Sequence, residues 1–207
     1  MTKSCLFLIA GLTVQAVIVD AIVATVGRAP VTDSMVRRNL RAAALMAKMP
    51  LEETAAVWEE NRNRLIEQAL VKEEIRISRY PVAQPDEIRA ATEQAKAQLG
   101  GAAAFPAKLR KYRLTEADVA ENLAWQITFS RFIAFRFRPA VQVTEDALRA
   151  FYATWKPPGE KPAFEAARDA VEQDFIAEES ARLLDRWLEA ERRQTRIETL
   201  QPKSEQP

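Results

Sequence analysis

The 207-residue chain contains no histidine, a single cysteine and only five glycines. Without histidine, neither a Ser-His-Asp nor a Cys-His nucleophile system can be built, and no imidazole metal site is available. The cysteine, Cys5, lies next to the N-terminus and has no partner for a disulfide within the chain. Catalysis would have to rest on carboxylates, lysine, tyrosine or serine. We therefore expect a protein that is not an enzyme and that holds no metal or cofactor.

Charge of one sign is also lacking, because 30 lysines and arginines face 29 aspartates and glutamates, for a net charge of +1. Such an even balance gives no field that would attract nucleic acid or an anionic membrane surface. The sequence has no glycine-rich loop that would hold phosphates, so a nucleotide is not expected either. These absences argue against nucleic acid, nucleotides and an anionic membrane surface as partners.

The N-terminus has the pattern of an export signal. Lys3 gives it a basic start, residues 5–12 form a compact apolar core, and Val14 and Ala16 are small residues placed for cleavage. We predict a cleaved signal peptide over residues 1–16, so that the chain meets a membrane only transiently. An uncleaved anchor helix is the alternative, but the apolar run is short for a span of about 20 residues.

Long stretches without glycine or proline predict that the rest of the chain is mostly α-helical. The predicted helices cover residues 33–48, 52–79, 86–99, 105–112, 115–137, 144–155 and 163–193, and every proline is expected at a break between them. Residues 20–26 and 31–32 have the β-branched composition of a strand and its return, and 196–200 of a third strand. We predict one small sheet that joins the N-terminal hairpin to the C-terminal strand.

The domain organisation follows from these elements. We predict a single domain over residues 17–200, an exposed linker at 156–163 and a polar tail at 201–207. The last helix carries one apolar stripe, and its short linker should fold it back as an integral part of the N-terminal fold. The stripe consists of Phe164, Ala167, Val171, Phe175, Leu184, Trp187 and Leu188.

Half of the aromatic residues fall between positions 125 and 155. They are the candidate peptide-binding residues of the chain: Trp125, Phe129, Phe132, Phe135, Phe137, Phe151, Tyr152 and Trp155. Their rings do not share one helical stripe, so they are either enclosed by other helices or present a face to a ligand. Core packing is the more common role for any single ring. Interleaved arginines also suggest single-stranded nucleic acid, which the zero net charge after cleavage and the export signal argue against.

Four passages resemble the SurA-type periplasmic chaperones and their peptidyl-prolyl isomerase relatives. They cover residues 19–33, 64–74, 114–152 and 166–197, in the order of the family's opening strand and first helix, second helix, aromatic segment and returning C-terminal helix. The resemblance implies a multi-helix chaperone domain in the periplasm. In family members with isomerase activity, a parvulin domain of about a hundred residues follows the Phe-Tyr segment. Here only residues 156–163 stand in that place, so no isomerase activity is expected.

Two functions follow as hypotheses. The first is an ATP-independent periplasmic chaperone that binds extended apolar or aromatic segments of unfolded exported proteins, with outer-membrane proteins as the expected clients. The second is a structural or adaptor subunit that binds one dedicated exported partner through the same surface. A chaperone suppresses aggregation of several unrelated unfolded proteins, whereas an adaptor suppresses none.

Overall fold

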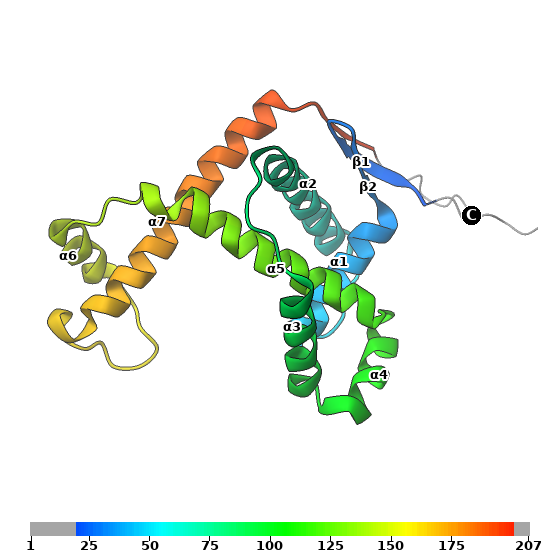
Figure 1. Cartoon of the computed structure of the whole chain (residues 1–207), viewed down its shortest axis with the longest axis horizontal. Helices are drawn as coiled ribbons and strands as arrows, with labels where there is room; N and C mark the ends of the chain where they lie inside the picture. The colour runs from blue at the N-terminus through cyan, green and yellow to red at the C-terminus, as the bar shows by residue number, and fades with distance from the viewer. Residues whose placement is uncertain (1–19, 201–207) are drawn as a thin grey trace, which may run out of the picture.

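The computed structural model describes residues 20–200, and the predicted signal peptide and polar tail lie outside the described residues. Within this range the fold is mostly helical with one small sheet, as predicted (Figure 1). The helices are α1 (Asp33–Met46), α2 (Ala55–Ser78), α3 (Pro85–Gln98), α4 (Gly101–Tyr112), α5 (Glu116–Arg136), the 3-10 turn η1 (Arg138–Ala140), α6 (Glu145–Thr154) and α7 (Phe164–Gln194). The strands are β1 (Ile22–Val26), β2 (Ala29–Thr32) and β3 (Ile197–Thr199).

The sheet ties the two ends of the described chain together. Its antiparallel strand order is β2-β1-β3, with Thr25 opposite Pro30 on one side and Glu198 on the other. Gly27 turns the hairpin at a φ of +57°, which a residue without a β-carbon adopts freely. Its N–H donates to the Arg196 carbonyl at 2.8 Å, so the turn itself is bonded to the approach to β3. The predicted pairing of the hairpin with the C-terminal strand is confirmed.

Threonine side chains fix where four helices begin. Thr32, Thr54, Thr115 and Thr144 each accept a hydrogen bond from the backbone N–H three residues on, which satisfies a donor that the first helical turn leaves free. The expected start of the second helix at residue 52 was wrong, because the Thr54 cap places it at Ala55.

The α4 helix corrects two further predictions. It begins at Gly101 rather than at residue 105, directly after Gly100 reverses the chain with a φ of +97°. Pro106 therefore lies inside the helix and not at a break. A proline in an early turn removes one backbone donor, and the carbonyl four residues before it stays open to other partners. The prediction that this proline marks a break between helices was therefore wrong.

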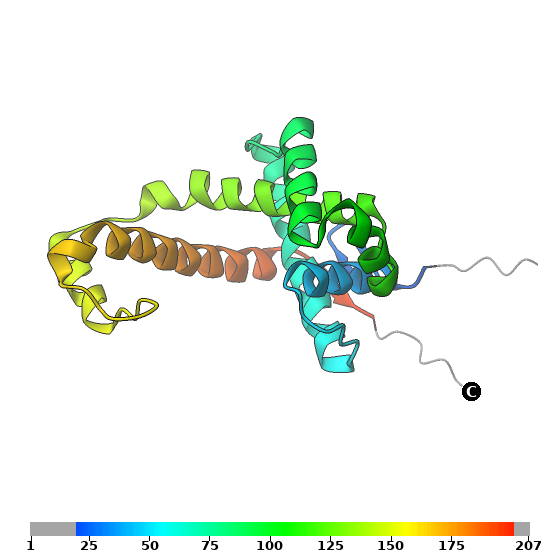
Figure 2. The same ribbon diagram turned by 90° about the horizontal axis from the view of Figure 1, so that it is seen from below.

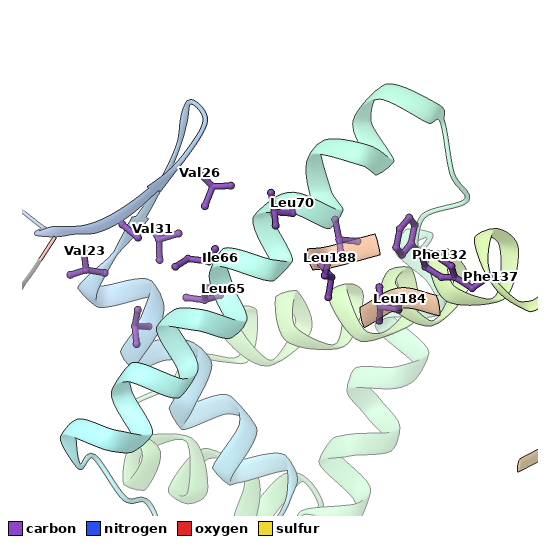
Figure 3. Close-up of a cluster of buried hydrophobic side chains, with 13 residues drawn as sticks. Val23, Val26, Val31, Leu65, Ile66, Leu70, Phe132, Phe137, Leu184 and Leu188 are labelled. Carbon is purple, nitrogen blue, oxygen red and sulfur yellow. The ribbon is translucent and has the colours of Figure 1, made fainter. Parts of the chain in front are cut away.

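Three clusters of buried apolar side chains hold the helices. The central cluster packs the sheet and α2 against the end of α5 and the second half of α7; Figure 3 labels its members Val23, Val26, Val31, Leu65, Ile66, Leu70, Phe132, Phe137, Leu184 and Leu188. A second cluster joins α1, α3 and α4 to the start of α5, and Phe105 and Val119 are among its most buried members. A third cluster belongs to α6 and the first half of α7.

The last helix divides its stripe between two of these clusters. Leu184, Trp187 and Leu188 pack into the central cluster, whereas Phe164 and Phe175 pack against α6. Residues 141–176 thereby form an arm that projects away from the sheet and from α1–α4 (Figure 2). The expectation that the whole stripe packs on the N-terminal fold was wrong for the first half, because the amphipathic α6 covers it instead.

The capping box of α5 gives the fold an acid-sensitive contact. Burial acts to raise the pKa of Asp118, but hydrogen bonds from the Thr115 hydroxyl and N–H, together with the Arg38 charge, outweigh it and lower that pKa below 3.8. A carboxyl with a lowered pKa in the folded state stabilises the fold above its unfolded pKa. This contribution is lost as the pH falls through the folded value.

We predict that Asp118→Asn lowers the free energy of unfolding by about 1–2 kcal/mol at pH 7, because the charge-assisted bonds to Thr115 are weakened. Urea unfolding measured from pH 7 downward should show the difference from the unchanged chain shrinking once the pH falls below about 4. Glu189→Gln, at an exposed α7 position, serves as the control and should change little. A constant difference between Asp118→Asn and the unchanged chain down to pH 2 would contradict the assignment.

Candidate functional site

The eight candidate aromatic residues do not form one surface. Five of them, Trp125, Phe129, Phe132, Phe135 and Phe137, lie on or directly after α5. The other three, Phe151, Tyr152 and Trp155, lie on or directly after α6 in the arm. The ring contacts among the described residues stay within each group and its own neighbours. The structure therefore divides the predicted site in two.

Phe132 and Phe137 belong to the core. Their exposed fractions are 0% and 6%, and both rings contact Trp187 of α7, with centroids 5.5 and 6.2 Å apart. Neither ring can reach a ligand in this conformation. Their assignment as binding residues is corrected to core packing, because α2 and α7 close over this side of α5.

The α6 aromatics hold the arm together. Tyr152 donates from its hydroxyl to the Pro162 carbonyl at 2.6 Å, and the Trp155 indole N–H donates to Asp174 at 2.7 Å. The Phe151 ring meets Phe175 edge-on at 5.6 Å. All three are half-buried, and the polar groups of Tyr152 and Trp155 are already bonded within the arm. Packing between α6 and α7 accounts for their position.

Three candidate rings retain a solvent-facing side. Trp125 and Phe129 are half-buried and stack with centroids 5.3 Å apart, and the Lys72 ammonium lies over the Trp125 ring. Phe135 is 65% exposed and touches Tyr80 edge-on at 5.5 Å. Of the eight residues, Phe129 is the one that borders a groove next to α7.

This groove lies between α5 and the middle of α7, because its lining residues come from these two helices and from Arg138 directly after α5. Its volume is about 640 Å³. We call it the α5–α7 groove and define it by its lining residues: Gln126, Phe129, Ser130, Ile133, Ala134, Arg138, Gln173, Ile176, Ala177 and Ser180. Half of them are apolar, and no carboxylate is among them. The groove is a candidate site for an apolar segment.

Ser180 and Arg138 are two of the polar lining residues whose side chains have no partner within residues 20–200. The Ser180 side chain is 2% exposed and its hydroxyl makes no hydrogen bond. Arg138 is exposed and pairs with no carboxylate of the described chain. Buried hydroxyl groups in folded proteins are nearly always bonded, so the Ser180 hydroxyl is unusual.

The two neighbouring arginines of the aromatic segment are both engaged. Arg131 bonds the Glu87 carboxylate and the Val82 carbonyl, which fastens α5 to the start of α3. Arg136 bonds Glu74 at 2.7 Å and lies over the Trp187 ring. The hydrogen bond from Arg131 is the main reason that the pKa of Glu87 is lowered. Arg138 differs from both in having no such contact.

Sequence reasoning missed the α7 side of the groove. Ile176, Ala177 and Ser180 lie where the predicted apolar stripe is interrupted, between Phe175 and Leu184. That interruption was the available signal, because a small residue and a hydroxyl replace large apolar side chains at helical spacing. Ile133 of α5 was missed because the predicted site residues on this helix were all aromatic.

Other features of the described residues point to no different chemistry. A larger hollow of about 950 Å³ lies beside the hairpin and α2, but charged side chains of both signs, including Lys72, Glu73 and Arg76, border it. Across residues 20–200 no three acidic side chains gather as a metal site would require. No helix in that range combines the length and apolar character needed to cross a membrane.

Comparison with known proteins finds no family model that matches this chain and no curated protein whose sequence matches it.

Proposed function

We propose that the protein is an ATP-independent periplasmic chaperone that shields extended apolar segments of unfolded exported proteins, with outer-membrane proteins as the expected clients. The observation that carries the proposal is the α5–α7 groove, which leaves an apolar surface accessible between two helices. A concave groove that combines apolar side chains with a few polar groups is typical of a binding site. The predicted signal peptide and the resemblance of four passages between residues 19 and 197 to the SurA-type family support the cellular location.

The lining chemistry suits loose and reversible binding. Phe129, Ile133 and Ile176 offer apolar contact area without demanding a particular side-chain sequence. Neutral amides of Gln126 and Gln173 border them and can bond peptide groups of an extended segment. Release then follows from weak binding at several points and requires no nucleotide. Without a parvulin domain, the proposal includes no prolyl isomerase activity.

A charge placed in the groove tests the proposal. Ala177→Asp is expected to reduce suppression of aggregation at least about fivefold, since burying an apolar segment against a carboxylate is unfavourable. The assay dilutes several unrelated unfolded proteins from denaturant and follows light scattering with increasing amounts of the full chain. Ala177 is exposed on its helix, so the variant should fold normally, which thermal unfolding verifies.

The matched control is Ala90→Asp, the same substitution at an exposed position of α3 outside the groove. It should leave suppression unchanged. Equal suppression by both variants would move client binding away from the groove. A full chain that suppresses aggregation of none of the unfolded proteins would favour the dedicated adaptor instead. Acceleration of prolyl isomerisation in a model peptide would contradict the absence of isomerase activity.

A further inference from the structure

Resting on the proposed function, we propose that the α5–α7 groove selects apolar segments that carry an acidic side chain. The acidic side chain pairs with Arg138, and the Ser180 hydroxyl donates a hydrogen bond to a backbone carbonyl of the segment. The ligand class is thus an extended peptide with a carboxylate among apolar residues, and a lysine or arginine in the same place is rejected.

The charges that line the groove are the reason to expect a preference for an acidic side chain. Its lining contains one cation, Arg138, and no anion, so the local field favours a negative group in the ligand. The guanidinium has no competing partner within residues 20–200, in contrast to Arg131 and Arg136. A guanidinium next to apolar surface binds a carboxylate through charge-assisted hydrogen bonds, which a neutral amide cannot fully replace.

The backbone around Arg138 is held in place before any ligand binds. Phe137, the residue before Arg138, is buried in the central cluster. Pro139, the residue after it, restricts the backbone on the other side. The 3-10 turn closes over Arg138, whose carbonyl accepts from the Val141 N–H at 3.2 Å. Only the side chain has to be ordered when a carboxylate binds, and this lowers the entropic cost.

The Ser180 hydroxyl is the reason to expect a hydrogen bond to the backbone of the segment. A serine inside a helix usually bonds a carbonyl of its own preceding turn, but this hydroxyl bonds nothing in the described chain although it is almost fully buried. It borders the groove beside Ile176 and Ala177. The hydroxyl oxygen is buried in this conformation, so we expect binding to turn the Ser180 side chain toward the groove, where it donates to a peptide carbonyl whatever the side chains of the segment. This bond adds affinity without sequence preference.

Three labelled peptides test the selection. They share one apolar sequence with acetylated and amidated ends and differ at a central position, which is Glu, Gln or Lys. Fluorescence anisotropy with the full chain at low salt should give the order Glu, Gln, Lys, with Glu about two- to fivefold tighter than Gln. Added salt should reduce this ratio toward one. Equal affinities for the three peptides would overturn the inference.

Two groove variants separate the two contacts. Arg138→Gln should abolish the Glu-over-Gln preference while leaving the Gln peptide's affinity unchanged, and the control Arg186→Gln, at an exposed α7 position, should keep the preference. Ser180→Ala should weaken all three peptides by about threefold without lowering thermal stability, because it removes an unbonded buried hydroxyl. A preference that survives Arg138→Gln excludes the ion pair, and unchanged affinities in Ser180→Ala exclude the backbone bond.

The aggregation assay distinguishes failure of this inference from failure of the proposed function. If Ala177→Asp loses suppression but the peptides bind equally, the groove binds clients without charge selection and only the inference falls. If no peptide binds and no unfolded protein is protected, both fall.

Discussion

Replacing Phe132 by alanine is expected to lower the free energy of unfolding by about 3–5 kcal/mol. The ring is fully buried and meets Tyr80, Phe137 and Trp187 with centroid separations of 5.1, 5.6 and 5.5 Å. It joins α5 to the connector after α2 and to α7, so its removal leaves a cavity between three segments that cannot all collapse. Urea unfolding followed by far-ultraviolet circular dichroism measures the loss.

Phe135→Ala is the matched control on the same helix. This ring is 65% exposed and its described ring contact is with Tyr80, so the loss should stay below about 1 kcal/mol. Equal losses for the two variants would contradict the division of the aromatic segment into core and surface. A large loss for Phe135→Ala alone would mean that α5 buries the face that carries Phe135 and not the face that carries Phe132.

The contrast between these rings marks what the sequence could not predict. Phe132 and Phe135 are separated by about 60° around a helix, and either could have faced the core. Local pattern does not say which side α2 and α7 cover, because that depends on contacts with residues more than 40 positions away, such as Trp187. The candidate site was therefore found in the right segment but with core and surface residues mixed.

Features that depend on residues close together in the sequence were predicted more accurately. The caps at Thr115 and Thr144 act within three residues, and the β-branched run at 22–26 requires a neighbour whatever the rest of the chain does. The sheet with β3 followed from that need, since a two-stranded hairpin is marginal alone. The arm was not predicted, because the apolar stripe on α7 indicates that this face of the helix is buried but not which helix covers it.

A chain ending at Lys156 is expected to lose most of its stability, more than about 5 kcal/mol. Truncation removes Leu184, Trp187 and Leu188 from the central cluster, and each buried leucine is worth about 1.5–3 kcal/mol. It also removes β3, which leaves β1 with one partner. Phe132 and Phe137 would then face water on the side that α7 now covers. Near-ultraviolet circular dichroism and thermal unfolding measure the effect.

A chain ending at Gln194 is the matched control, because it keeps the packed face of α7 and loses β3 together with the Arg196 carbonyl that bonds the hairpin turn. Its thermal midpoint should fall between those of the full chain and of the chain ending at Lys156, since three strand residues contribute less than the buried face of a helix. If the chain ending at Lys156 instead keeps a cooperative transition and its near-ultraviolet spectrum, α7 is an independent arm. Its exposed stripe would then replace the α5–α7 groove as the surface expected to bind clients.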